Sequence, residues 1–305
     1  MWLYAVSNKT IVSGGPEGAI TWDLPSKSII CRFGTDCWCA CPVPGTTNIV
    51  LGGLNGSVVL WDYRKGISVA TLQGAEETIY CVAVSDDGRW IAAGNGMDVD
   101  QRNPPYPDPT IWIWDAKAIN NLPRRILGHQ GTIGRLAFAG NDVLISISAD
   151  NTIRKWDVGA ASQIGIDGTP RPNFYGGSRA VLHQSLAIAP DKESFILGGI
   201  LLDVSTLASV RRFPKEDTTA WMFLASPNRI AYGTNLGLAG VCDGDGKEIW
   251  SRQVKVNKAP VTCLAYLAAS NELVTAGEAV TPALAALQWN VPMRDVTIKV
   301  WQLPE

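Results

Sequence analysis

The sequence predicts an all-β fold, a seven-bladed β-propeller with a last blade that lacks its outer strand. The first observation behind this prediction is a recurring stretch in which a short apolar strand, a tight polar turn and a second strand ending in Trp-Asp follow one another. Its clearest copy runs from Ile145 to Asp157, with Asp150-Asn151 at the turn. Two strands around a tight polar turn indicate a β-hairpin, and one hairpin is not stable alone in water. The copies must therefore bury one another.

The second and third observations are the period and the number of these copies. The residues that close them are Asp23, Asp62, Asp115, Asp157, Asp203, Asp243 and Gln302. The gaps between them are 39, 53, 42, 46, 40 and 59 residues. A period of about 40 residues with four short strands per unit is typical of propeller blades. The two longest gaps contain insertions, so the pattern predicts seven units.

The units divide the chain, treated as one domain of residues 1–305, at approximately 1–33, 34–74, 75–128, 129–168, 169–214, 215–257 and 258–305. The first unit reads as four strands, WLYAVS, TIVSGG, AITWDL and KSIICRF, from the innermost outwards. The second repeats this order with CWCACP, NIVLGGL, SVVLWDY and ISVATLQ. The third is interrupted by Met97–Pro109, whose prolines cannot lie inside a sheet, so we expect a loop there.

The later units differ in regularity. The fourth is the most regular, whereas the fifth and sixth carry Leu202 and Cys242 where the other units have tryptophan. A Pro/Gly-rich connection, Gly168–Ser178, precedes the fifth unit. A long insertion, Glu278–Asp295, precedes the third strand of the seventh.

These features resemble the WD40-repeat family over essentially the whole chain. The motifs that carry the resemblance are Gly128-His129 with Trp156-Asp157, and the pairs Trp22-Asp23, Trp61-Asp62 and Trp114-Asp115. In that family a His, a Ser or Thr, an Asp and a Trp form a hydrogen-bonded network within each blade. The matching positions in the fourth unit are His129, Ser146, Asp150 and Trp156. Because the other units lack the histidine, the resemblance implies one such network here.

The resemblance also bears on how the ring closes. The family usually completes its last blade with a strand from the opposite chain end, but here the first unit uses the N-terminal strand as its own innermost strand. We therefore expect the third strand of the last unit, Val296–Leu303, to be an edge without an outer neighbour. Such an edge is either tolerated or paired by another chain through strand addition at 296–303. A piece of a longer protein would explain it equally well.

Composition limits the class of partner. The net charge is -2 and Lys and Arg form no run, so nucleic acid is not an expected partner. No apolar run reaches the length of a membrane span, which argues against membrane insertion. The seven cysteines are an odd number, and no basic segment precedes an apolar run at the start. These features predict a cytoplasmic protein with free thiols.

Few residues suggest catalysis. The sequence holds two histidines, His129 and His183, and none of the common nucleophile, phosphate-loop or dinucleotide motifs. We therefore predict no catalytic residues, no cofactor and no metal. An enzyme built on a propeller, such as a hydrolase, is a further alternative. It would need a carboxylate cluster or a metal in the central channel.

Three short motifs have structural interpretations that outweigh functional ones. Cys37, Cys39 and Cys41 alternate, so on a strand they would face one way and act as small apolar side chains rather than metal ligands. Asp243–Gly246 reads as a hairpin turn rather than a calcium loop. Trp61–Arg64 resembles the box of WD40 substrate receptors of cullin-type ubiquitin ligases, but a solvated turn arginine explains it more simply.

The insertions give the main functional hypothesis. In a propeller, the loops from second to third strands emerge on the same face as the loops between blades, so Met97–Pro109, Gly168–Ser178 and Glu278–Asp295 should share one face. Its candidate binding residues are Asp98, Asp100, Arg102, Tyr106, Arg171, Phe174, Tyr175, Arg179, Trp289 and Arg294. Aromatic and arginine side chains on loops are typical of protein-binding sites. The alternative is that the apolar residues of the last insertion only pack that loop onto its own blade.

The sequence thus favours a non-enzymatic scaffold or recognition module that binds a protein or peptide on this face. A ligand-sensing or regulatory domain of a larger signalling protein is the second reading. Trp38 and Trp221, near the starts of innermost strands, either line the mouth of the channel or, as the preferred interpretation, pack in the core.

Overall fold

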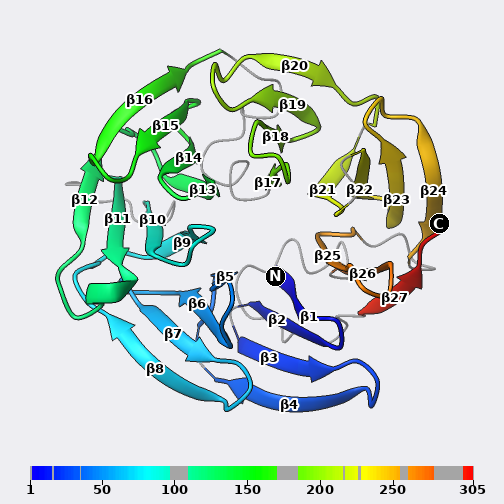
Figure 1. The fold of residues 1–305 in the computed structure, drawn as a ribbon, viewed down its shortest axis with the longest axis horizontal. Coiled ribbons are helices and arrows are strands. Elements are labelled where there is room, and N and C mark those ends of the chain that lie inside the picture. Colours follow the sequence, from blue (N-terminus) through cyan, green and yellow to red (C-terminus); the bar gives the residue numbers. More distant parts are fainter. Residues whose placement is uncertain are drawn as a thin grey trace, which may run out of the picture.

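Seven antiparallel sheets stand in a ring around a central axis (Figure 1). The computed structural model describes residues 2–15, 17–34, 36–96, 109–169, 185–215, 217–225, 228–254, 260–277 and 298–304. Within these residues six sheets have four strands and the last has three, which confirms the predicted propeller and its shorter last blade. No helix of the described residues has the length and apolar character to cross a bilayer.

Each blade uses its strands in chain order from the axis outwards (Figure 1). The innermost strands are β1 (Trp2–Ser7), β5 (Cys39–Pro42), β9 (Ile79–Val84), β13 (Ile133–Ala139), β17 (Leu186–Ile188), β21 (Thr218–Phe223) and β25 (Cys263–Leu267). The second strands are β2 (Thr10–Gly15), β6 (Asn48–Gly52), β10 (Trp90–Asn95), β14 (Val143–Ser148), β18 (Ser194–Leu197), β22 (Arg229–Thr234) and β26 (Glu272–Ala276). The third strands are β3 (Gly18–Asp23), β7 (Val58–Asp62), β11 (Thr110–Asp115), β15 (Ile153–Asp157), β19 (Ile200–Asp203), β23 (Leu238–Asp243) and β27 (Lys299–Gln302). The outer strands are β4 (Ser28–Phe33), β8 (Ile67–Leu72), β12 (Arg124–Leu127), β16 (Ser162–Asp167), β20 (Ser209–Arg212) and β24 (Glu248–Gln253).

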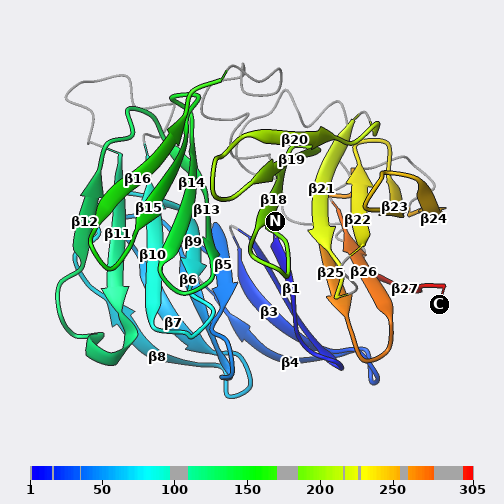
Figure 2. The same ribbon diagram turned by 45° about the horizontal axis from the view of Figure 1, so that its top comes forward.

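This antiparallel order gives the propeller two different ends (Figure 2). Second strands join third strands, and each blade joins the next, at what we call the upper end, which carries residues 53–57, 128–132 and 149–152. First strands join second strands, and third strands join outer ones, at the lower end, which carries residues 43–47, 85–89 and 189–193.

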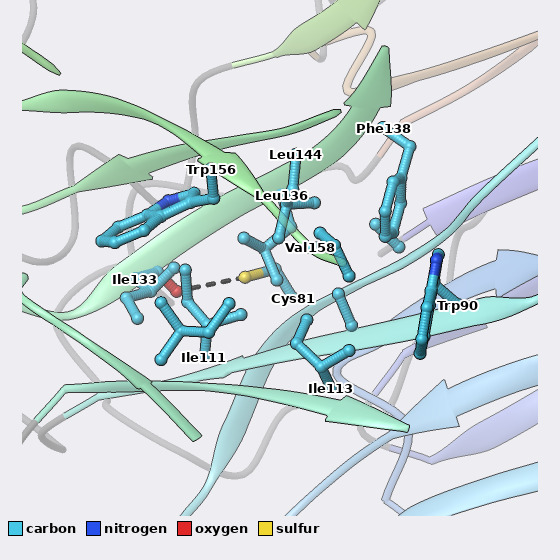
Figure 3. Close-up of a cluster of buried hydrophobic side chains, with 13 residues drawn as sticks. Cys81, Trp90, Ile111, Ile113, Ile133, Leu136, Phe138, Leu144, Trp156 and Val158 are labelled. Atoms are coloured by element: carbon cyan, nitrogen blue, oxygen red, sulfur yellow. Dashed lines mark hydrogen bonds between the residues drawn. The ribbon is translucent and has the colours of Figure 1, made fainter. Parts of the chain in front are cut away.

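In the five blades whose third strand carries a tryptophan, that side chain packs against the preceding blade. Trp156 of blade four lies in a cluster with Ile111 and Ile113 of blade three (Figure 3). Trp22 of blade one packs against Val274 and its neighbours in blade seven, so this contact closes the ring by side-chain packing. Burying one such side chain contributes about 2–3 kcal/mol.

Blades five and six follow the same register with smaller side chains. Leu202 pairs with Phe195, and Cys242 pairs with Ile230, as Trp156 pairs with Leu144 in blade four. These pairings place both residues at the tryptophan position, as the sequence indicates.

Aromatic side chains from other strands fill the space beside Cys242. The ring centroid of Trp221 lies 5.3 Å from that of Phe213 and 5.8 Å from that of Tyr232. Trp221 is 4% exposed, so the preferred interpretation of this residue as a core side chain is correct. Tyr232 in turn requires Gly240, because a Cβ there would lie 2.4 Å from the tyrosine hydroxyl.

The cysteines of the second blade correct one prediction. Cys39 and Cys41 pack on the cluster between blades two and three, whereas Cys37 packs on the cluster between blades one and two. The prediction that all three face one way is wrong for Cys37, because β5 begins only at Cys39 and the alternation of a strand does not extend back to it.

Candidate protein-binding face

The strand ends that flank the three long connections all lie at the upper end. Residues 97–108 follow β10 and precede β11, residues 170–184 lie between β16 and β17, and residues 278–297 lie between β26 and β27. At the first of these, the backbone N–H of Thr110 donates to the side-chain carbonyl of Asn95 at 2.5 Å, and both residues are buried. This hydrogen bond therefore joins the end of β10 to the start of β11 without using any residue of the connection itself.

The predicted binding residues cannot be placed in this geometry. Asp98, Asp100, Arg102, Tyr106, Arg171, Phe174, Tyr175, Arg179, Trp289 and Arg294 all lie outside the described residues. Their shared role stays a prediction, supported only by where the flanking strands end.

An aromatic pair lies at the starts of two innermost strands on the upper side. The rings of Trp38 and Tyr80 meet edge to face, with centroids 6.4 Å apart. Trp38 is partly exposed, and its buried Nε1 has no hydrogen-bond partner within the described chain. The sequence analysis singled out Trp38 but missed Tyr80. The sequence contained a signal for Tyr80, because both units have an aromatic residue directly before a cysteine at or near the start of the innermost strand. These dipeptides are Trp38-Cys39 and Tyr80-Cys81.

The four side chains of the expected blade network are joined by hydrogen bonds at the upper end. The indole Nε1 of Trp156 donates to Ser146 Oγ at 2.7 Å, and Ser146 Oγ lies 2.6 Å from His129 Nε2. His129 Nδ1 lies 2.8 Å from Asp150 Oδ2. An indole can only donate, so the Ser146 hydroxyl accepts from Trp156 and donates a hydrogen bond to Nε2 of His129. The neutral histidine then donates from Nδ1 to the carboxylate of Asp150. Every member is then satisfied.

Burial and hydrogen bonding set the charge states of this network. Burial lowers the pKa of His129, and the bond to Asp150 offsets only part of that effect, which favours the neutral imidazole. Burial alone would raise the pKa of Asp150, but donation from His129, Thr152 and the backbone of Gln130 outweighs it and holds the pKa well below its usual range. The network therefore fixes the loop at 128–132 to the turn at 149–152.

Other blades keep parts of this arrangement. Trp22 Nε1 donates to Ser13 Oγ at 2.8 Å in blade one, and Trp301 Nε1 donates to Thr275 Oγ1 at 3.0 Å in blade seven. In blade two the register places Leu51 where blade four has Ser146, and the buried Trp61 Nε1 has no partner in the described part of the chain. The complete network occurs once among the described blades, and its tryptophan–hydroxyl half occurs in two more.

The channel-facing groups bear on the enzyme alternative. Arg135 of β13 interacts electrostatically with Cys81, Tyr4, Cys39 and Cys263, which come from four other innermost strands, and desolvation lowers its pKa. No carboxylate or histidine is among these groups. Within the described residues no cluster of His, Cys, Asp and Glu is placed to hold a metal ion.

We expect the buried thiols to react slowly with alkylating reagents. Burial raises the pKa of Cys81 and Cys37 to about 12, and that of Cys41 and Cys242 to about 11. At pH 8 a pKa of about 11 leaves about 100-fold less thiolate than the ordinary value of 9.0. Iodoacetamide labelling followed by mass spectrometry, in buffer and in urea, measures this difference. Equal rates for Cys81 in both conditions would contradict it.

The structure agrees with the structural interpretation of two short motifs, Trp61–Arg64 and Asp243–Gly246. Asp62 Oδ1 accepts from the backbone N–H groups of Arg64 and Lys65, and Arg64 is exposed in the turn at the lower end. Asp243 Oδ1 likewise accepts from the backbone of Asp245 and Lys247, in the predicted hairpin turn between β23 and β24. Neither motif contributes to the upper end.

Comparison with known proteins agrees with this architecture. Residues 66–115 and 121–157 match the family model described as WD domain, G-beta repeat. Protein SPA1-RELATED 4 of Arabidopsis thaliana is 32% identical over 148 residues, which cover 47% of this chain and 16% of that protein. Protein LST8 homolog of Drosophila melanogaster is 30% identical over 160 residues, which cover 49% and 48%. Cilia- and flagella-associated protein 52 of Bos taurus is 25% identical over 158 residues, which cover 49% and 23%.

The chain spans less than half the length of each of these relatives. WD40 propellers generally act as scaffolds for protein interaction. Two segments of this chain therefore match WD40 repeats, and its described residues form the ring of seven blades that defines a β-propeller.

Proposed function

We propose that this chain is a non-enzymatic module that binds a protein or peptide partner through its upper end. One observation carries the proposal: the described strand ends that flank residues 97–108, 170–184 and 278–297 all lie at that end. Each loop sequence carries aromatic and arginine residues, which are the types enriched among the residues that supply most of the binding energy in protein interfaces.

The described upper end is suited to hold such loops in place. The Asn95–Thr110 hydrogen bond closes the base of one connection, and the blade-four network fixes residues 128–132. The Trp38–Tyr80 pair adds aromatic surface beside the mouth of the channel. A rigid scaffold that presents variable loops loses less conformational entropy on binding than a flexible one.

The test shortens the connections without disturbing the blades. In one variant Gly-Ser linkers replace residues 97–108 and 279–296, and a second carries Arg171→Ala with Tyr175→Ala. The matched control carries Arg64→Ala with Lys117→Ala, both exposed at the lower end. Quantitative affinity purification should show partner recovery falling by about tenfold or more in the first two variants and within about twofold of wild type in the control. Equal recovery by all variants that keep the wild-type unfolding midpoint would overturn the proposal.

The same proposal includes the cellular setting. All seven cysteines are free, which supports a reducing compartment such as the cytoplasm. Because the chain spans less than half of its relatives, a regulatory role within a larger signalling protein is a second form of the proposal. Gel analysis of the native gene product against the 305-residue chain distinguishes the two forms.

Strand addition at 296–303 is a second candidate mode of partner binding. β27 pairs with β26, no outer strand covers it among the described residues, and Val300 is 42% exposed. The backbone of Leu303 bonds to Asn271 of the β26 side, so by alternation the groups of Val300 and Gln302 point outwards. A partner strand there should slow amide exchange at these two residues, and unchanged exchange in the complex would exclude it.

A further inference from the structure

A groove opens between blades five and six at the lower end, opposite the proposed binding face. Its volume is about 490 Å³, within the range of sites that take a small ligand or a few side chains. Five apolar side chains are among its described lining residues: Ala189, Leu201 and Val210 from blade five, and Phe223 and Ile230 from blade six.

The groove lies at the interface where the usual tryptophan is replaced by a thiol. Phe223, Ile230 and Cys242 pair across β21, β22 and β23 and form one row facing blade five. In blade four the corresponding row ends in Trp156. Trp221 and Tyr232 fill space beside Cys242, but Leu201 and Phe223 remain partly exposed to the groove.

The rim of the groove is acidic. It carries Asp191 from the β17–β18 turn, Asp243 at the end of β23 and Asp245 from the β23–β24 turn, and among the described lining residues Arg211 is the one that is basic. Arg211 pairs with Asp245 and also donates to the carbonyl of Gly244. One guanidinium against three carboxylates leaves the lining with a net charge of about -2 at neutral pH.

We propose that this groove binds a peptide segment of a partner in which an arginine or lysine stands next to a leucine or phenylalanine. The apolar floor would bury the leucine or phenylalanine, and the carboxylates of Asp191 and Asp243 would attract the neighbouring cation. Val210 is 62% exposed on β20, so the wall is accessible before binding. The site lies at the end opposite the proposed binding face, so a partner at the upper end would leave it open.

The probe for this site is a fluorescein-labelled hexapeptide, Gly-Arg-Leu-Arg-Phe-Gly. Its controls replace both arginines by glutamate, or the leucine and phenylalanine by alanine. Fluorescence anisotropy should show saturable binding of the probe in the micromolar range, weakened about tenfold or more by either peptide change and by raised salt.

Two protein variants locate the binding. Val210→Lys places a cation on the wall, and Val69→Lys makes the same change at a residue of β8 that is 51% exposed, remote from the groove. The first should weaken binding about tenfold and the second should leave it within about twofold. Probe binding should also survive replacement of residues 97–108, which separates this site from the upper end. No saturable binding at millimolar protein, or equal binding by both valine variants, would overturn the proposal.

Discussion

Replacing Trp156 by alanine is expected to lower the free energy of unfolding by about 3–5 kcal/mol, because a large buried side chain is lost and a cavity remains. Trp156 is 2% exposed and lies with Ile111 and Ile133 in the cluster shared by blades three and four (Figure 3). Its indole also donates to Ser146, so the variant removes the first donor of the network. Urea unfolding followed by tryptophan fluorescence or circular dichroism measures the loss.

Two comparisons separate packing from hydrogen bonding in this prediction. Cys242→Ala, at the same register in blade six, should cost only about 1 kcal/mol since it removes a single sulfur atom. Trp156→Phe removes a satisfied N–H, whereas Trp61→Phe removes one that has no partner among the described residues. The first should therefore cost about 1 kcal/mol more than the second. Equal costs for the two phenylalanine variants would mean that the blade-four network adds nothing to stability.

Asp150→Ala is the second change with a large expected effect, about 3–5 kcal/mol of unfolding free energy, because several donors lose one acceptor and each buried unsatisfied donor costs about 1–3 kcal/mol. The carboxylate accepts from His129 Nδ1, from the backbone of Gln130, and from the backbone and hydroxyl of Thr152. Without it the buried His129, the half-buried Thr152 and the exposed backbone N–H of Gln130 lose their acceptor. Asp157→Ala is the matched control. Its carboxylate accepts from the backbone of Ala160, so we expect a cost of about 1 kcal/mol or less.

The His129–Asp150 pair is expected to make the folded state less stable in acid. The folded state lowers the pKa of both His129 and Asp150, so their stabilisation is complete above about pH 6.5, where the unfolded histidine is neutral. This stabilisation falls as the pH drops, because the unfolded state binds protons more readily than the folded state. The loss comes first from His129 and then, below about pH 4, from Asp150. Urea midpoints between pH 8 and pH 4 should therefore decline less steeply in His129→Gln than in wild type. Parallel curves for the two proteins would contradict this assignment.

Much of the fold could be predicted because each repeat carries local sequence motifs that mark its strands and turns. The Trp-Asp pairs and turn residues mark strand ends, and the seven strand sets fall within the predicted units. The replacement of tryptophan at Leu202 and Cys242 was also readable from the sequence. The side chains that fill the space left by the missing tryptophan could not be predicted. Trp221 and Phe213 come from other parts of the chain than Cys242 and join its cluster only in the folded structure.

The candidate sites were less predictable, for a related reason. The upper end follows from strand order, but the groove beside Phe223 and Ile230 depends on how two weak blades pack together, which no local pattern encodes. Cys37 shows the limit of alternation, since a strand that starts two residues late places it in a different cluster from Cys39. Likewise, Trp61 Nε1 has no partner in the described chain because Leu51 stands where blade four has the hydroxyl of Ser146.

Hydrogen–deuterium exchange of the chain, alone and in complex with a partner recovered by wild type but not by the shortened variant, tests the central claim most directly. We predict slower exchange at residues 53–57, 73–78 and 128–132 of the upper end, with residues 43–47 and 85–89 of the lower end unchanged. Protection confined to the lower residues would contradict the claim that partners bind this chain through its upper end.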